Sequence, residues 1–231
     1  MRALLDLVFP PRCAGCDLPG TLLCDSCQAA VPRIDPASAC TRCGAPIAGL
    51  LCAECAGRTF AFRAARSAAL LEPPVSRAIV VLKDGGERRY AVVLASLLAE
   101  AADGWLVPDD VLVPVPASPA ARRRRGFDHA VDVTRALGTL TGLPVAEVLR
   151  SRVTADQRAL GREQRAANRA GSFDVTGEVA GGRVVLVDDV FTTGATLDAA
   201  ARALICVGSP TIRALSVARA CSRVTPAEVR A

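Results

Sequence analysis

Uninterrupted runs of apolar residues, rather than alternating ones, mark the strands that this chain is expected to form. Residues 184–187 read Val-Val-Leu-Val, and residues 110–116 read Asp-Val-Leu-Val-Pro-Val-Pro. A continuous apolar run is typical of a strand that is buried on both faces, as the strands of a parallel sheet are. Residues 143–149 suggest a third strand. We therefore expect a sheet that is covered on both faces.

Segments with helical spacing lie between and after these runs. Residues 90–102, 130–140 and 197–205 have the composition and periodicity of helices. Strands that alternate with helices predict an α/β fold, in which a parallel sheet is flanked by helices. Ligands of such folds bind where strands end and helices begin, so the segment after residue 187 is a candidate site by its position alone.

That segment also carries the clearest candidate chemistry. Two acids, Asp188 and Asp189, come first, and a small hydroxyl-rich turn then leads into the 197–205 helix. The turn consists of Thr192, Thr193, Gly194, Ala195 and Thr196. Its backbone N–H groups and hydroxyls suit a phosphate at a helix N-terminus, where the helix dipole favours negative charge. The acids would repel that phosphate, so vicinal ribose hydroxyls and Mg²⁺ are their natural partners.

This arrangement resembles the phosphoribosyl-pyrophosphate (PRPP) signature of type I phosphoribosyltransferases: an apolar strand, two acids and a Thr-Thr-Gly phosphate loop. The resemblance implies that Asp188 and Asp189 are catalytic and hold the ribose hydroxyls. It also implies that residues 192–196 bind the 5-phosphate and that Mg²⁺ accompanies PRPP. The alternative is a buried strand whose acids cap a turn, which explains the two acids but not the Thr-Thr-Gly-Ala-Thr that follows.

Cysteine is concentrated near the N-terminus in four Cys-x2-Cys pairs. The eight residues are Cys13, Cys16, Cys24, Cys27, Cys40, Cys43, Cys52 and Cys55. This spacing lets both thiolates of a tight turn reach one tetrahedral Zn²⁺, so eight thiolates predict two closed, structural sites. Four copies of a redox motif would be unusual, and an iron–sulfur cluster is the other alternative. Cys206 and Cys221 stand apart and are expected to be buried thiols without a ligand.

The cysteine-rich segment is expected to form its own small domain. Placing the first two pairs on one ion and the last two on the other needs only short loops, so we prefer it to a cross-braced arrangement. We assign residues 1–58 to a double zinc ribbon that begins with a short helix at 1–9, and residues 59–231 to the α/β domain. Because residues 1–9 lack the features of an export signal, we expect a reducing, cytoplasmic location.

A run of four arginines at residues 122–125 lies between the 110–116 strand and the following helix. Alone, such a run is typical of a solvated turn or a nucleic-acid contact. Its position matches that of the phosphate loop, and both should meet at one edge of the sheet, where Arg122 and Arg125 would neutralise a pyrophosphate. The polar stretch at residues 157–173 resembles the mobile loop that closes over PRPP in type I phosphoribosyltransferases. Arg165 of this stretch is the third arginine expected at the ligand.

The chain as a whole resembles the ComF family, a branch of the type I phosphoribosyltransferases. The motifs are Phe9-Pro10-Pro11-x-Cys13-x-x-Cys16, Pro114-Val-Pro116, Arg125-Gly126-Phe127, Gln157-x-x-Leu160 with Arg165-x-x-Asn168-x-x-x-x-Phe173, and Asp188-Asp189-x-x-Thr192-Thr193-Gly194. The chain departs from the family's usual Gly-Phe-Asn-Gln, because Asp128 and His129 follow Phe127. For His129, packing or capping at the start of a helix is favoured over a role as catalytic base.

The resemblance implies a PRPP-binding phosphoribosyltransferase that acts with Mg²⁺ on an unidentified acceptor. The alternative is a non-enzymatic accessory protein of competence and DNA uptake, with PRPP as a regulatory ligand. In that case residues 122–125 and 158–169 would contact single-stranded DNA, or the protein would bind partners of the competence machinery. Aromatic residues, on which single strands usually stack, make up only 3% of the chain. No run approaches the ~18 apolar residues of a membrane span, so membrane insertion is not expected.

Overall fold

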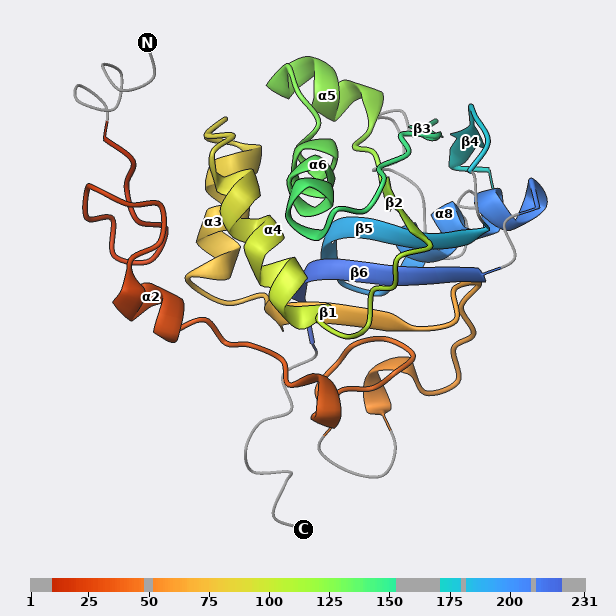
Figure 1. Cartoon of the computed structure of the whole chain (residues 1–231), viewed down its shortest axis with the longest axis horizontal. Helices are drawn as coiled ribbons and strands as arrows, with labels where there is room; N and C mark the ends of the chain where they lie inside the picture. Colours follow the sequence, from red (N-terminus) through yellow and green to blue (C-terminus); the bar gives the residue numbers. More distant parts are fainter. Residues whose placement is uncertain (1–9, 48–51, 153–170, 180–181, 209–210, 222–231) are drawn as a thin grey trace, which may run out of the picture.

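A four-stranded parallel sheet forms the centre of the molecule (Figure 1). The computed structural model describes residues 10–47, 52–152, 171–179, 182–208 and 211–221 of the chain. The strands are β1 (Ala65–Leu70), β2 (Asp110–Pro114), β5 (Arg183–Phe191) and β6 (Thr211–Arg219), in the order β1-β6-β5-β2. All three pairings are parallel, so the four carboxyl ends meet at one edge. The predicted α/β class with a parallel sheet is confirmed.

Helices cover both faces of this sheet (Figure 1). They are α3 (Val75–Lys83), α4 (Tyr90–Ala101), α6 (His129–Thr141) and α8 (Ala195–Cys206). The short helix α5 (Pro119–Arg125) follows β2 and has no buried residue. Val185 and Val187 of β5 pack into a core with α3, α4 and α6, whereas Val184 and Leu186 pack into a second core with α8. Neighbouring residues of β5 therefore enter two different cores, which explains the continuous apolar run. None of the helices in the described part of the chain combines the length and apolar character of a membrane span.

The strand β5 is longer than the apolar run predicted. It continues through Asp188 and Asp189 to Phe191, because Asp188 and Val190 still pair with β6. The two acids are therefore part of the hydrogen-bonded strand, near its carboxyl end, rather than after it.

Residues 143–149 form the expected third strand only in part. Val145 makes a single parallel bridge with Leu112, and the Ala146 N–H donates to the Leu112 carbonyl at 2.9 Å. Pro144 has no N–H to donate, which limits a longer ladder here. The regular strand β3 (Leu149–Ser151) instead pairs antiparallel with β4 (Phe173–Val175) in a separate sheet.

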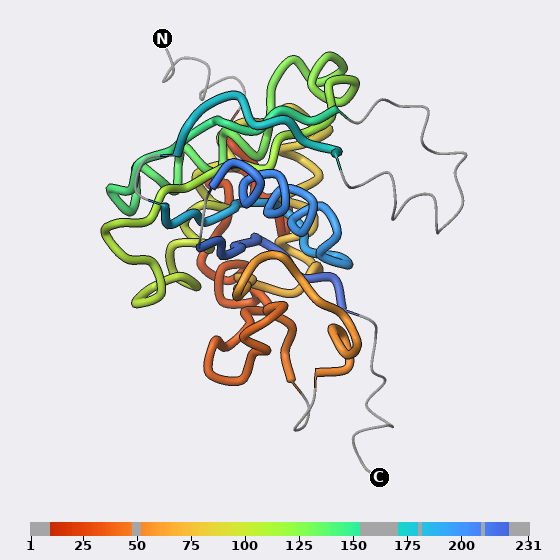
Figure 2. The backbone as a smooth tube through the Cα atoms, turned by 90° about the vertical axis from the view of Figure 1, so that its right-hand side faces the viewer, coloured from red at the N-terminus to blue at the C-terminus, as the bar shows by residue number. Residues whose placement is uncertain are grey.

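The cysteine-rich segment runs along one side of the sheet and beneath it (Figures 1 and 2). Its described elements are short: α2 (Asp25–Ala29), η1 (Pro36–Ser38) and η2 (Ala53–Cys55). The Ile34 N–H donates to the Ala68 carbonyl at 3.0 Å, and the Leu70 N–H donates to the Pro32 carbonyl at 2.9 Å. This contact covers the outer edge of β1. The helix expected at 1–9 lies outside the described residues.

Candidate functional site

The carboxyl end of β5 leads into the N-terminus of α8 through residues 192–194. We call residues 192–196, which include the first two residues of α8, the phosphate turn. Gly194 is the residue before the helix and has a φ of 77°, in the left-handed region. A Cβ atom at this position would lie 2.5 Å from Phe191 Cζ and 3.0 Å from Phe60 Cε1. Glycine is therefore required both by the backbone conformation and by the aromatic rings below the turn.

The upper surface of the phosphate turn is open to solvent. Thr192, Thr193 and Thr196 are exposed, and Ala195 is the first residue of α8. The first N–H groups of a helix have no acceptor within the helix, so an N-terminus at the carboxyl edge of a sheet offers donors to an anion. The structure thus brings the five predicted phosphate-binding residues together in one turn.

The two acids differ in their surroundings. Asp189 is buried, with 6% of its surface exposed, and forms an ion pair with Lys83, the last residue of α3. The Nε2 atom of His129, the first residue of α6, lies 3.4 Å from Asp189 Oδ2. Asp188 is half-buried, accepts the Asp189 N–H at 2.9 Å, and pairs with no basic side chain among the described residues. The two acids therefore lie in different surroundings.

These surroundings shift the two pKa values in opposite directions. Desolvation raises the pKa of the Asp188 carboxyl well above its usual range, and the neighbouring Asp189 charge adds to the rise. Burial also opposes ionisation of Asp189. Contact with His129 and the charge of Lys83 outweigh that effect and hold the pKa of Asp189 below its usual range. Asp189 is the acid that stays ionised.

The arginine run forms a short helix, not the expected loop. Ser118 caps α5 by accepting the Ala121 N–H, and the four arginines make up its second half. Arg125 is turned inward: its Nη2 lies 3.2 Å from Asp84 Oδ1, and its Nη1 lies 3.4 Å from His129 Nδ1. Arg122 is exposed, with Nε 3.8 Å from Asp128 Oδ2. Arg165 lies outside the described residues, as does most of the 157–173 loop.

Sequence reasoning missed the group that surrounds Asp189. Asp128, not His129, caps α6, by accepting the Ala130 N–H at 3.2 Å. His129 instead joins Asp189 and Arg125 in a buried cluster. Lys83 completes this cluster through its ion pair with Asp189. It is the single lysine of the chain, and that was the one sequence feature that could have pointed to it as a site residue.

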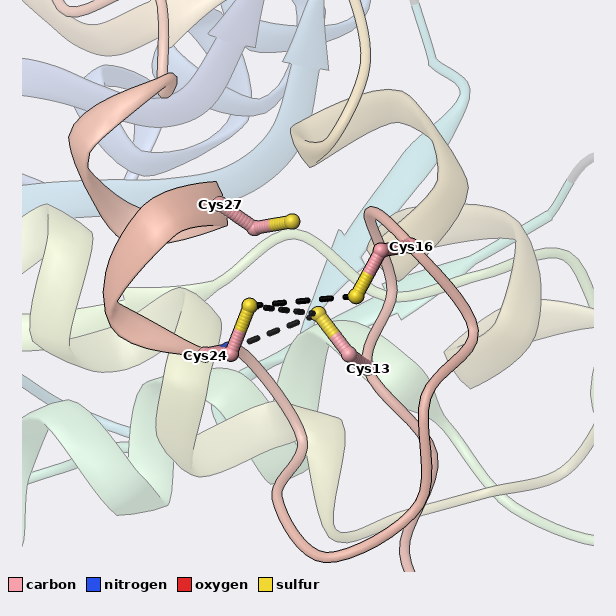
Figure 3. Close-up of side chains that lie close together, drawn as sticks. All are labelled: Cys13, Cys16, Cys24 and Cys27. Atoms are coloured by element: carbon pink, nitrogen blue, oxygen red, sulfur yellow. Dashed lines mark hydrogen bonds between the residues drawn. The ribbon is translucent and has the colours of Figure 1, made fainter.

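The eight N-terminal cysteines form two clusters. Cys13, Cys16, Cys24 and Cys27 make up the first cluster (Figure 3), and Cys40, Cys43, Cys52 and Cys55 make up the second. Within each cluster the sulfur atoms lie within 4.8 Å of one another. The sequential pairing expected from the sequence is confirmed. Cys206 is exposed and Cys221 half-buried, so the expectation of two buried thiols was wrong for Cys206 in particular, which lies in the last turn of α8 at the surface.

The sulfur spacing fits a tetrahedral metal. Sulfur–sulfur distances of 3.7 and 3.8 Å occur in the first cluster, and of 3.7 and 3.6 Å in the second. Four sulfurs at about 2.3 Å from one ion lie about 3.8 Å apart, whereas a disulfide would need about 2.0 Å. All four donors of each cluster are cysteines, which leaves no open position. Both clusters are structural Zn²⁺ sites.

Comparisons with known proteins agree with both parts of the chain. A family model described as a double zinc ribbon domain matches residues 4–56, and one described as a phosphoribosyl transferase domain matches residues 120–228. The chain is similar to DNA utilization protein YhgH of Salmonella typhimurium, at 30% identity over 227 residues, which are 92% of this chain and 99% of the relative. The same protein of Escherichia coli K12 is 29% identical over the same shares of the two chains.

A partial match extends the comparison to competence proteins. Competence protein F of Haemophilus influenzae is 32% identical over 116 residues, which are 48% of this chain and 51% of the relative. Since the two matched domains follow one another in the expected order, and since one relative is matched over nearly its whole length, the chain belongs to the ComF family of phosphoribosyltransferase-like proteins.

Proposed function

We propose that this chain binds PRPP, or a related 5-phosphoribosyl ligand with Mg²⁺, and transfers the phosphoribosyl group to an acceptor nucleophile. One observation carries the proposal. The strand β5 carries an acidic pair near its carboxyl end and leads through Gly194 into the N-terminus of α8. A carboxylate beside a turn that offers N–H groups and hydroxyls suits a sugar whose 2- and 3-hydroxyls and 5-phosphate lie on one molecule.

In this proposal the acceptor nitrogen attacks the anomeric carbon while the bond from that carbon to the pyrophosphate oxygen breaks. Pyrophosphate leaves with the electron pair, and positive charge develops on the ribose ring. Asp188 accepts hydrogen bonds from the ribose hydroxyls and stabilises that charge. Asp188 would help to hold Mg²⁺, which, when bound, would offset the charge of the pyrophosphate. Asp189, next to Asp188 in the strand, keeps Lys83 and His129 in place.

Replacing Asp188 by Asn is expected to weaken PRPP binding roughly 10- to 100-fold, because hydrogen bonds to a charged group contribute about 1.5–3 kcal/mol. Calorimetry with PRPP and Mg²⁺ measures the affinity, and the wild-type chain should saturate at one ligand. The matched control is Asp109→Asn, an exposed acid before β2 at the opposite edge of the sheet. Equal affinity in the wild type and both variants would remove Asp188 from the site.

PRPP affinity is also expected to rise with pH. Because the pKa of Asp188 is raised, part of the free protein carries a proton there that the ligand must displace. The rise should begin above the ordinary aspartate value of about 4 and end once the raised pKa is passed. The ligand's own phosphates titrate too, so the Asp188 contribution is the difference between wild type and Asp188→Asn in the same buffers. A difference that stays constant with pH would contradict the assignment.

Single-stranded DNA is the second candidate ligand. The relatives are named for DNA utilization and competence, and α5 presents three exposed arginines, Arg122, Arg123 and Arg124. We expect DNA binding that is weak and falls with salt. Substituting these three residues by Ala should make the log–log salt dependence shallower by roughly 0.7 per lost phosphate contact. Arg202→Ala, an exposed arginine on α8, is the control. A salt-resistant, sub-micromolar DNA complex in a protein that ignores PRPP would reverse the order of the two candidates.

A further inference from the structure

Arg219 occupies the middle of the carboxyl edge of the sheet. It is the last residue of β6, pairs with Leu70 on one side and Phe191 on the other, and is only 2% exposed. Its Nη1 donates to the Thr192 carbonyl at 2.6 Å and to the Phe191 carbonyl at 3.0 Å. The guanidinium also lies 4.4 Å from the centre of the Phe191 ring. Nη1 of Arg219 thus holds the start of the phosphate turn.

The remaining nitrogens of the same guanidinium contact the second cysteine cluster. Arg219 Nε donates to the Cys43 carbonyl at 3.2 Å, and Nη2 lies 4.0 Å from Cys43 Sγ. Nη2 is also 3.6 Å from the carboxylate of Glu54, which lies between Cys52 and Cys55. A single buried guanidinium therefore contacts both the second cysteine cluster and the phosphate turn.

Two neighbouring residues, Arg58 and Phe60, also contact the phosphate turn. Arg58 Nη1 donates to the Thr193 carbonyl at 3.2 Å, and its own carbonyl accepts from Arg42 Nη2 at 2.7 Å. Phe60 packs beneath Gly194. In Figure 2 the orange segment that contains residues 58–60 lies beside the blue start of α8. The first cluster has a different neighbour, because Arg77 of α3 donates to the Gly15 carbonyl at 2.8 Å.

Burial of a charged guanidinium is favourable only while its donors are satisfied. The acceptors around Arg219 come from Phe191 and Thr192, from the carbonyl of the adjacent Ala220, and from the second cysteine cluster. The first two and the last belong to segments that are far apart in the sequence. Metal-bound thiolates carry negative charge, and the groups that donate to them tune the site and are oriented by it. We propose that Arg219 is a positioning residue through which the second cysteine cluster orders the phosphate turn. As a result, zinc in that cluster raises the affinity for the phosphoribosyl ligand. The ligand half of this inference rests on the proposed function.

The test compares Arg219→Lys with Arg77→Lys in the full chain. Lysine keeps the charge at position 219 but cannot reach Thr192 and Cys43 together. Amide hydrogen exchange of residues 192–196, zinc content and PRPP affinity are measured on each protein. We expect Arg219→Lys to speed exchange in the turn and to weaken PRPP binding on the order of tenfold, while Arg77→Lys leaves the turn as in the wild type. Unchanged exchange and affinity in Arg219→Lys would overturn the inference.

A second measurement does not depend on Arg219 variants folding. In Cys16→Ser only the second cluster keeps a complete ligand set, so a chelator added to this protein reports on that cluster alone. Exchange at residues 192–196 should rise as this zinc is removed, and exchange that stays unchanged would overturn the inference. If exchange responds but the wild type does not bind PRPP, the proposed function fails and the link between cluster and turn stands.

Discussion

Replacing Asp189 by Asn is expected to lower the free energy of unfolding by about 3–5 kcal/mol, the cost of removing one partner of a buried ion pair. The side chain of Asp189 is 8% exposed, and the substitution leaves the Lys83 ammonium, 22% exposed, without its counter-charge beside His129. Urea unfolding of both proteins at neutral pH measures the difference. This outcome separates Asp189 from Asp188, whose replacement should act on ligand affinity.

The control for this prediction is the same substitution in an exposed pair. Asp174 and Arg152 form an ion pair with side chains 35% and 63% exposed, so Asp174→Asn should cost no more than about 1 kcal/mol. The pKa of Asp189 is lowered in the folded state, so its contribution exists above about pH 4 and is lost as the pH falls further. If Asp189→Asn and Asp174→Asn were equally stable at neutral pH, the buried cluster would not be an ionised one.

Zinc removal is expected to have the largest effect of all. Binding of a structural Zn²⁺ by four thiolates contributes about 10–16 kcal/mol, far more than the cysteine-rich segment gains from its own apolar core. Elemental analysis of the purified protein should give two zinc ions per chain. Close to one ion or none, or an absorption band of an iron–sulfur cluster, would contradict the assignment.

The two clusters should differ in what their loss does to the rest of the molecule. Cys43 is fully buried and packs in the core that contains Val184 and Leu186, whereas Cys16 is exposed. Cys43→Ser should therefore remove one zinc and lower the melting temperature of the whole chain, while Cys16→Ser should remove one zinc with a smaller thermal effect. Cys206→Ser, at an exposed cysteine outside both clusters, should change neither quantity. Equal melting temperatures for the two ligand variants would show that the second cluster does not support the sheet.

The strands that could be predicted are those whose burial is visible in their composition. The run at residues 184–187 is apolar at every position because neighbouring side chains enter different cores. β1 was missed because Ala-Arg-Ser-Ala-Ala-Leu relies on small residues and on a buried hydrogen bond between Ser67 and Ser216, 2.7 Å long. Neither feature produces a hydrophobic pattern, so only the packed structure reveals that strand.

The candidate site divides in the same way. The cysteine clusters are local in sequence, and their spacing was enough to predict them. The phosphate turn is also local, and its position between β5 and α8 was predicted from its residue types. Lys83 of α3 meets Asp189 of β5, and Arg219 of β6 meets Cys43 of the second cluster, so each contact joins segments that lie far apart in the sequence. Contacts of that kind depend on topology, and the equivalence that the sequence suggested for Asp188 and Asp189 was lost for the same reason.

The contact of residues 32–34 with β1 also bears on how the chain avoids association with other copies. The outer edge of β1 is covered by the Ile34–Ala68 and Leu70–Pro32 hydrogen bonds, which come from the segment between the two clusters. A protease that released this segment would leave an exposed strand edge, with unpaired N–H and carbonyl groups ready to join another copy. The segment between the two clusters therefore acts as a cap that keeps the edge of β1 from pairing with another copy.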